Sequence, residues 1–402
     1  MDAAAAPELE QAFVPQQAKR HRIVRAARTA SISDAGITGG VGWAMDYAGL
    51  WVTSNGGASW ITATPPHVRR TGAAFDRVLQ VQYVDRMHGW VSADDVFGGF
   101  TIPTGSPTLR HMEIDRTTDG GRTWRSFLPP GCLESCGAPY LSFLSARLGF
   151  ALTPGGGLFT DEDGGTTWRS VSRPAFTGAI QFLDPRDGFG VSDPRRWAGF
   201  EGEVPVGGGI VYRTSDGGRT WSQLRLRPPV AYIGWREDAD SIRFFAGGRG
   251  VLAVRFRNPR THEQRLVVYT STDAGETWAA HPAPSSVHLW PRQWGISASG
   301  SFSAATPSAW VVMDRRVLHV TTDGGRRWRT VRPLDLPRHA SIWQETFTSA
   351  ADGWAIVGLD GGPALIHTTD GGRWWSPLTP PVPKLPRLHP RAPMCGSSCR
   401  RP

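Results

Sequence analysis

The sequence predicts an all-β protein, a seven-bladed β-propeller built from four-stranded antiparallel blades. Three observations lead to this prediction. An octapeptide typical of a tight hairpin occurs seven times, at intervals that fit one four-stranded blade plus loops. The 402 residues include 18 Trp, 48 Gly and 32 Pro, which favours short strands joined by turns. No long segment has apolar residues at helical spacing.

Each octapeptide, here called a clip, predicts the turn between the third and fourth strands of a blade. The seven clips are TSNGGASW at 53–60, TTDGGRTW at 117–124, DEDGGTTW at 161–168, TSDGGRTW at 214–221, STDAGETW at 271–278, TTDGGRRW at 321–328 and TTDGGRWW at 368–375. The third residue can fold its side chain onto the backbone N–H groups ahead. The glycines supply positive φ, and the closing Trp packs on the sheet and starts strand 4.

We therefore expect a structural role, not catalysis, for the third and last clip residues. These are Asn55, Trp60, Asp119, Trp124, Asp163, Trp168, Asp216, Trp221, Asp273, Trp278, Asp323, Trp328, Asp370 and Trp375.

A second pattern precedes each clip and predicts strand 2. It is a small residue followed by an aromatic one, as in Gly42-Trp43-Ala44 and Gly353-Trp354-Ala355. Blade 6 offers Ala309-Trp310-Val311 in this place, and blade 5 has the weakest version, Gly250-Val251-Leu252. A single sheet of this kind cannot bury both faces, whereas seven arranged radially can.

The clips resemble the Asp-box (BNR) repeat, S/T-x-D-x-G-x-T-W, over about residues 29–379. Together with the Gly-Trp-Ala pattern, they are most similar to propellers of the photosystem II assembly-factor type and their bacterial relatives. The departures are Asn55, Ser59, Asp161, Arg327 and Trp374, all compatible with the turn. The resemblance implies the fold but not the function, because Asp boxes occur in sialidases, other glycosidases, sortilin-like receptors and non-catalytic scaffolds.

Three segments follow: a flexible basic segment at 1–28, the propeller at 29–379 and a tail rich in Pro and Arg at 380–402. Most of the net charge of +9 lies in the two terminal segments, so the propeller body is close to neutral. A near-neutral body is a poor surface for phosphate backbones. Nucleic-acid binding by the basic ends is therefore only a third hypothesis. We expect a monomer with no cofactor and no metal.

Four cysteines form two C-x-x-x-C pairs, Cys132 with Cys136 and Cys395 with Cys399. Local disulfides, free thiols and a shared zinc site are the three interpretations, and the long interval between the pairs disfavours zinc. No signal peptide and no membrane-spanning segment is visible. The compartment stays open: extracytoplasmic if the true start lies upstream, and cytoplasmic otherwise.

The alternation of strand direction assigns the connections to two faces. The turns between strands 1 and 2 share one face with the clips, here called the clip face. The longer connections, near 62–77, 92–110, 126–140, 192–209, 222–238, 279–292 and 330–340, share the opposite, long-loop face. Loops positioned by a rigid scaffold commonly carry function. Carboxylates of this face include Glu237, Asp238 and Asp240.

We expect binding on the long-loop face, where Arg, Trp and acidic residues recur. The candidates are Arg69, Arg70, Asp94, Asp95, Arg195, Arg196, Trp197, Glu201, Glu203, Trp235, Arg236, Trp290, Trp294 and Arg338. Arg and Trp are frequent interface anchors. Solvated loop acids, scattered Arg and blade-packing Trp are the competing interpretation of the same residues.

The predicted function is a non-catalytic scaffold that binds a protein, glycan or cell-envelope partner. The alternative is an exo-acting glycoside hydrolase of sialidase-like architecture, for which a carboxylate pair across the funnel would be needed. The string nearest to the sialidase landmark is Phe100-Thr101-Ile102-Pro103, which lacks its Arg. No catalytic residue is assigned.

Overall fold

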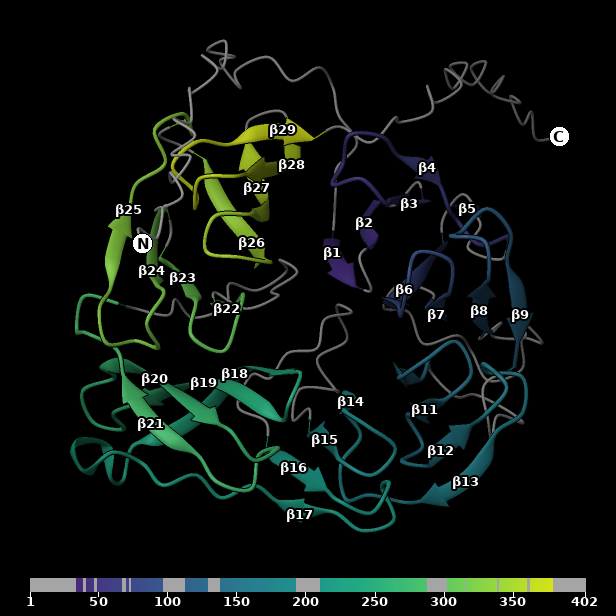
Figure 1. The fold of residues 1–402 in the computed structure, drawn as a ribbon, viewed down its shortest axis with the longest axis horizontal. Helices are drawn as coiled ribbons and strands as arrows, with labels where there is room; N and C mark the ends of the chain where they lie inside the picture. Colours follow the sequence, from purple (N-terminus) through teal and green to yellow (C-terminus); the bar gives the residue numbers. More distant parts are fainter. Residues whose placement is uncertain are drawn as a thin grey trace, which may run out of the picture.

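The computed structural model shows seven β-sheets arranged around a central axis (Figure 1). It describes residues 34–38, 41–46, 49–66, 70–71, 74–96, 113–128, 138–192, 210–287, 302–314, 316–337, 340–359 and 362–378. The first full-length strand of each sheet lies nearest the axis, and the last lies at the rim (Figure 1). All neighbouring strands pair antiparallel, which confirms the predicted seven-bladed all-β propeller.

The blades follow one another along the chain. Blade 1 contains β1 (Asp34–Thr38), β2 (Val41–Asp46), β3 (Gly49–Thr53) and β4 (Ile61–Thr62). Blade 2 contains β5 (Arg70–Thr71), β6 (Ala74–Tyr83), β7 (Gly89–Val96), β8 (Glu113–Thr117) and β9 (Arg125–Phe127). Blade 3 contains β10 (Tyr140–Phe143), β11 (Gly149–Leu152), β12 (Leu158–Asp161) and β13 (Arg169–Ser172). Blade 4 contains β14 (Ile180–Phe182), β15 (Gly188–Val191), β16 (Val211–Thr214) and β17 (Ser222–Gln223).

Blade 5 contains β18 (Arg236–Phe245), β19 (Arg249–Arg257), β20 (Gln264–Ser271) and β21 (Ala279–Pro282), and a 3-10 turn, η2 (Val230–Tyr232), precedes it. Blade 6 contains β22 (Phe302–Ala304), β23 (Trp310–Asp314), β24 (Val317–Thr321) and β25 (Arg329–Val331). Blade 7 contains β26 (Ser341–Phe347), β27 (Gly353–Leu359), β28 (Gly362–Thr368) and β29 (Ser376–Leu378).

Blade 2 departs from the four-stranded prediction. Part of the expected loop at 62–77 is the short strand β5, which pairs with the start of β6 to make a fifth strand. Among the described strands, no sheet combines segments from both ends of the chain, since blade 1 is β1 to β4 and blade 7 is β26 to β29. The ring therefore closes through side-chain packing between complete blades.

The clips are held by their own polar side chains. In blade 2, the Thr117 hydroxyl donates to Asp119 Oδ1 at 2.8 Å and accepts the Gly121 N–H at 2.8 Å. The Asp119 carboxylate accepts the Thr123 N–H at 2.9 Å and the Thr123 hydroxyl at 2.6 Å. These bonds from Thr123 and Thr117 lower the pKa of Asp119 to about 2. The carboxylate is thus engaged within its own turn.

Clips and strand 1–2 turns meet at the same end of each blade. A clip N–H donates to a carbonyl of the turn, as from Gly120 to Met87 (2.9 Å) and from Gly164 to Arg147 (2.9 Å). Equivalent bonds join these two turns in blades 4 to 7. The prediction that the clips and the strand 1–2 turns share one face is therefore confirmed.

The Gly before each strand 2 aromatic is required by close packing inside the blade. A Cβ on Gly149 would lie 2.3 Å from the Phe143 ring at the end of strand 1, and one on Gly89 would lie 2.5 Å from the Tyr83 ring. The ring at this position faces the preceding blade, so we call it the seam ring. The seam rings of blades 2 to 5 and blade 7 are Tyr83, Phe143, Phe182, Phe244 and Phe347.

Blade 6 exchanges the two positions, which corrects the predicted phase. Trp310 pairs with Thr321, the clip-opening Thr, whereas in the other blades a Gly holds this register position. Ala304 on strand 1 is the cross-strand neighbour of Trp310, and it stands where blades 2 to 5 and blade 7 carry the seam ring. Trp310 is therefore the seam ring of blade 6, and not the equivalent of Trp43. Its ring lies 6.3 Å from Trp328, as Phe143 lies 6.1 Å from Trp168.

The seams between blades are stacks of rings. At the seam of blades 2 and 3, Trp90 stacks on Phe143 at 3.7 Å, and Trp168 meets Phe143 edge-on. The same arrangement joins Phe150, Phe182 and Trp221, and again Phe189, Phe244 and Trp278. Such aromatic pairs add roughly 0.5–1.5 kcal/mol each beyond the area they bury.

Near the axis, hydrogen bonds from side chains to backbone groups join the inner strands of neighbouring blades. The Gln80 amide donates to the Leu141 carbonyl at 2.8 Å and accepts the Leu141 N–H at 2.7 Å, and Gln82 does the same with Phe143. Ser142 accepts the Phe182 N–H at 2.8 Å. These bonds satisfy edge groups of the inner strands that no neighbouring strand reaches.

Candidate functional site

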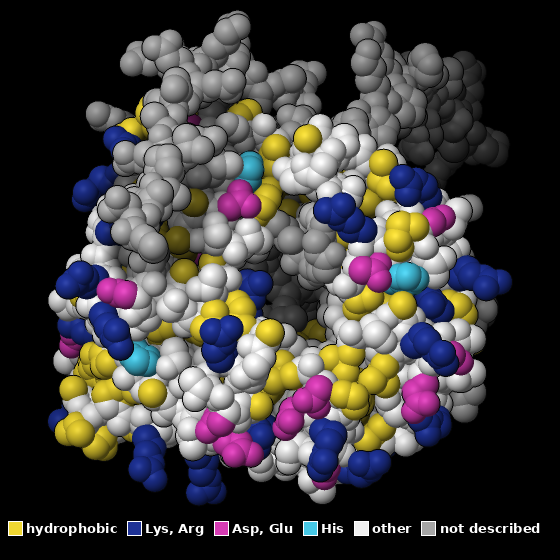
Figure 2. All heavy atoms as spheres, in the orientation of Figure 1, with side chains coloured by type: hydrophobic (Ala, Val, Ile, Leu, Met, Phe, Trp, Pro, Cys, Tyr) yellow, Lys and Arg dark blue, Asp and Glu magenta, His cyan; other side chains and the backbone are white. Residues whose placement is uncertain are grey.

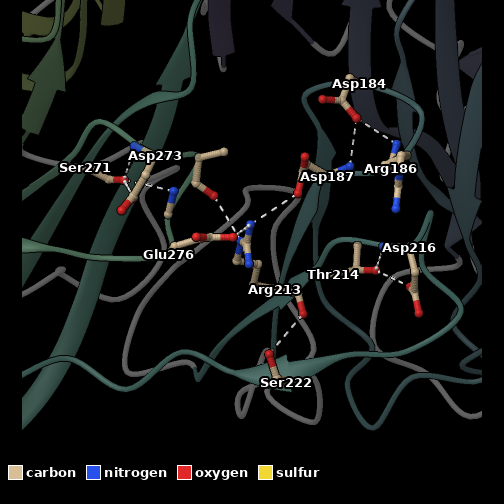
Figure 3. Close-up of polar contacts among 12 residues, drawn as sticks. Asp184, Arg186, Asp187, Arg213, Thr214, Asp216, Ser222, Ser271, Asp273 and Glu276 are labelled. Carbon is tan, nitrogen blue, oxygen red and sulfur yellow. Dashed lines mark hydrogen bonds and ion pairs between the residues drawn. The ribbon is translucent and has the colours of Figure 1, made fainter.

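The clip face is occupied by contacts of the fold itself. Basic and acidic side chains are intermixed around the ring in the view of Figure 2. Arg213 illustrates the pattern: its Nε donates to the Ala274 carbonyl of the next blade at 3.0 Å, and its guanidinium lies 3.3 Å from both Asp187 and Glu276 (Figure 3). The polar groups of this face thus tie clips to neighbouring blades.

On the long-loop face, blade 5 carries the most distinct described feature. Its three inner strands have 10, 9 and 8 residues, longer than their counterparts in blades 3, 4 and 6. Before β18, the chain makes the turn η2, and Gly234 takes a positive φ of 80° that brings the chain into the strand. We call η2, residues 233–235 and the β19–β20 connection the blade 5 crown.

The crown presents apolar side chains on an ordered turn. Val230 is 86% exposed and Ile233 is 67% exposed. The turn beneath them is anchored, because Tyr232 packs 5.0 Å from Trp235 and 5.5 Å from Phe256, ring centroid to centroid. The Trp235 N–H also donates to the Tyr232 carbonyl at 3.1 Å. Val230 and Ile233 thus expose apolar side chains on a turn whose conformation is held by packing beneath it.

The β19–β20 connection forms the second half of the crown. Asn258 Oδ1 accepts the N–H groups of Arg260 at 2.9 Å and Thr261 at 3.1 Å, an Asx-type turn. Arg257 bonds His262 Nδ1 at 2.9 Å. Arg236 and Arg257 are opposite each other in the register of β18 and β19. Two cationic residues therefore lie at the strand ends beside the apolar turn.

Glu237, in β18 next to the crown, is the carboxylate that bears on the hydrolase alternative. Burial by neighbouring atoms raises the pKa of its carboxyl above the ordinary value, although the side chain remains exposed. Burial, followed by the charge of Glu237, also raises the pKa of Tyr269, whose hydroxyl donates to the Arg227 carbonyl at 3.1 Å. A raised carboxyl pKa is one property of a general acid.

The predicted binding residues are placed unevenly. Trp235 lies in the crown, and Arg236 follows it as the first residue of β18. Arg70 lies in β5 and Asp94 and Asp95 in β7, and their side chains are not described. Outside the described residues lie Arg69, Arg195, Arg196, Trp197, Glu201, Glu203, Trp290, Trp294, Arg338 and the four cysteines Cys132, Cys136, Cys395 and Cys399.

Two groups of acids assigned to loops lie in strands instead. Asp94 and Asp95 belong to β7, and Glu237, Asp238 and Asp240 belong to β18. The reason is cross-strand pairing: Asp94 lies opposite Arg77, and Asp238 lies opposite Arg255. Opposite charges in register favour extension of both strands.

Val230, Tyr232 and Ile233 were not among the predicted binding residues. Their signal in the sequence is the apolar run that follows Pro228-Pro229 in a predicted loop. Which of these side chains face solvent depends on Tyr232 packing against Phe256, a contact between residues 24 positions apart in the chain. Sequence pattern alone does not reveal such a contact.

Known proteins share the fold of this chain. No family model matches it. It is 27% identical over 271 residues to the oligoxyloglucan-reducing end-specific xyloglucanase of Emericella nidulans, which covers 54% of this chain and 31% of that protein. The chain thus spans about a third of the length of this curated relative.

Two solved propellers are similar in structure. YCF48 bound to D1 peptide has a TM-score of 0.51 at 18% identity, covering 85% of this chain and 92% of that one. YCF48 from Cyanidioschyzon merolae has a TM-score of 0.51 at 16% identity, covering 85% and 96%. At these identities the likeness shows the propeller fold alone.

The described ranges hold neither a metal-ligand cluster nor a membrane-spanning helix. No group of three or more His, Cys, Asp or Glu side chains there is placed to hold a metal ion. None of the helical segments in those ranges has the length and apolar character needed to cross a bilayer.

Proposed function

We propose that this protein is a non-catalytic propeller scaffold that binds a protein or cell-envelope partner through its long-loop face. The observation that carries the proposal is the blade 5 crown, where Val230 and Ile233 are exposed on an anchored turn beside Trp235 and Arg236. Aromatic and Arg residues around an apolar centre are the usual anchors of an interface. The clip carboxylates then serve the turns, as in the Asp-box repeat and the assembly-factor propellers that the sequence resembles.

Recognition of a peptide is within reach of this architecture. A propeller similar to this chain has been solved with a D1 peptide bound. The crown adds a physical reason for this chain: covering two aliphatic side chains removes apolar surface from water at about 25 cal/mol per Å². A rigid turn also loses little conformational entropy when it is covered.

The test compares the crown with a matched site on the opposite face. The double variant Val230→Ser/Ile233→Ser removes the apolar pair, and Met87→Ser removes an exposed apolar side chain (47%) from the clip face. Partners captured by wild type from the source organism are identified, purified and titrated against all three proteins. We expect affinity to fall at least tenfold for the double variant and by less than twofold for Met87→Ser. Equal affinity for all three proteins would remove the crown from the proposal.

The hydrolase alternative is supported by the partial similarity to a xyloglucanase and by the raised pKa of Glu237. Screening with fluorogenic glycosides and xyloglucan oligosaccharides separates the two functions. Turnover that Glu237→Gln or another long-loop carboxylate change abolishes would favour the hydrolase and defeat the scaffold.

A further inference from the structure

At the seam between blade 7 and blade 1 the register position of the seam ring is not aromatic, although the buried Trp51 packs in the same apolar cluster as Ile356 and Leu365. Blades 2 to 7 all carry a seam ring at the same place in the blade. At this register position blade 1 has Ile37, which pairs with Gly42, and Gly42 pairs with the clip-opening Thr53. The position is thus aliphatic at the seam where the two ends of the propeller meet.

A cavity of about 130 Å³ lies at this seam. Blade 7 lines it with Trp354, Ile356 and Leu365, among others, and blade 1 with Trp43 and Trp60. Trp354 and Trp60 are the two residues that correspond to Trp90 and Trp168, the outer members of the stack on Phe143. The outer aromatic residues are thus present on both sides of the cavity.

The flanking tryptophans also lack contacts that their counterparts make. Trp90 donates its indole N–H to the Gly164 carbonyl of the next blade at 3.0 Å, whereas Trp354 stacks on His367 of its own blade at 4.6 Å. Five clip tryptophans donate to the carbonyl of their second clip Gly, as Trp168 does to Gly165 at 3.1 Å. The buried indole N–H of Trp60 has no partner among the described residues, a state that it shares with the clip tryptophan Trp124 of blade 2.

The opening of the cavity lies toward the clip face. Gly56 of the first clip and Thr348 of the β26–β27 turn both line it and are both exposed. Thr346 adds a hydroxyl group to a lining that is otherwise mostly apolar, whereas the hydroxyl of Thr53 donates to Asn55 and accepts the Gly57 N–H within its own clip. The depth therefore suits an apolar ring, and the mouth suits one polar substituent.

We propose that this seam binds a small one-ring aromatic molecule of the phenol class, whose ring takes the place of the absent seam ring. The volume fits, because an engineered apolar protein cavity of about 150 Å³ accepts benzene. Flatness matters as well, because Phe143 lies almost parallel to Trp90, with 5° between the ring planes. A bound ring joins blade 7 to blade 1, so the ligand stabilises closure of the propeller.

The experiment titrates the full-length protein with p-cresol and with the non-planar 4-methylcyclohexanol, and follows Tm and calorimetric binding. We expect saturable binding of one p-cresol per chain with a rise in Tm, and at least tenfold weaker binding of the saturated alcohol. Ile37→Phe places a ring at the register position used in blades 3, 4, 5 and 7. This variant is expected to have a higher starting Tm and to lose p-cresol binding.

A second variant protects the test against a folding defect in the first. Ala355→Leu enlarges a described lining residue, 2% exposed, from the blade 7 side and is also expected to abolish binding. Absence of p-cresol binding to wild type would overturn the proposal. So would undiminished binding in a folded Ile37→Phe or Ala355→Leu protein, or equal affinity for the two alcohols.

Discussion

At the residue scale, the clip of blade 3 shows what happens when one hydroxyl becomes a carboxyl. Asp161 stands where other clips have Thr or Ser, and it is fully buried. Its oxygens accept the N–H groups of Asp163 at 3.1 Å and Gly164 at 2.9 Å. Burial, followed by the hydrogen bond to the Asp163 carboxyl, raises the pKa of Asp161 to about 6. To donate to Asp163 as Thr117 donates to Asp119, Asp161 must carry a proton.

A pH dependence follows, and its sign is determined by the raised pKa. A group whose pKa rises on folding contributes stability that is complete below its unfolded value of about 3.8 and is lost as pH increases through the folded value of about 6. The substitution Asp161→Asn keeps the shape of the side chain without its charge. We therefore expect the unfolding free energy of Asp161→Asn, relative to that of wild type, to be larger at pH 7.5 than at pH 4.5. The relative gain is about 1–3 kcal/mol, since one pKa unit corresponds to roughly 1.4 kcal/mol.

Urea unfolding at the two pH values measures this difference. Asp119→Asn is the matched control, because that carboxylate has a lowered pKa and its contribution changes only under more acidic conditions. A constant stability difference between Asp161→Asn and wild type across the two pH values would contradict the interpretation.

At the element scale, a blade needs one ring facing the preceding blade, and either inner strand can supply it. Blades such as blade 3 place Phe143 on strand 1 against Gly149 on strand 2. Blade 6 places Trp310 on strand 2 against Ala304 on strand 1. The constraint is the summed volume of the pair, because the space between two sheets is close-packed.

The exchange in blade 6 predicts strong coupling between these two residues. Trp310→Gly leaves a void and is expected to cost about 3–5 kcal/mol, while Ala304→Phe overfills the seam and costs about 1–3 kcal/mol. The double variant restores the common pattern of one ring and one Gly. We expect the double variant to lose less unfolding free energy than the sum of the two single losses, by at least about 1 kcal/mol, as measured by denaturant unfolding. Strict additivity would show that the two positions do not share one space.

At the scale of the whole molecule, the sequence predicts the blade number and order well, because each clip is a local structure. Thr117, Asp119 and Thr123 bond one another within seven residues, so their pattern is visible in the sequence. The predicted phase of blade 6 was wrong because the exchange of the ring and the small residue between strand 1 and strand 2, at Ala304 and Trp310, appears only in the strand register. The exposure of Val230 likewise depends on a packing contact, between Tyr232 and Phe256, that no local pattern encodes.

Because every blade is a contiguous segment, the chain should tolerate new ends between blades. We expect a circular permutant opened between β21 and β22, with residue 378 joined by a linker to residue 34, to fold to the same ring with Tm within about 10 °C of wild type. Opening instead at the β23–β24 turn divides one sheet between the two ends. A far larger loss of Tm is expected there, and circular dichroism with thermal unfolding measures both. Equal losses would show that the blade is not the independent unit.

The absence of a composite blade also governs how the molecule would respond to a pull on its two ends. Such a load falls first on the contact between blade 1 and blade 7, where van der Waals contacts between side chains resist it. A ring fastened by a shared sheet would instead have to shear a row of backbone hydrogen bonds. For the strands that the structure describes, we therefore expect the ring to open at lower force than one closed by a shared sheet, with its seven sheets intact.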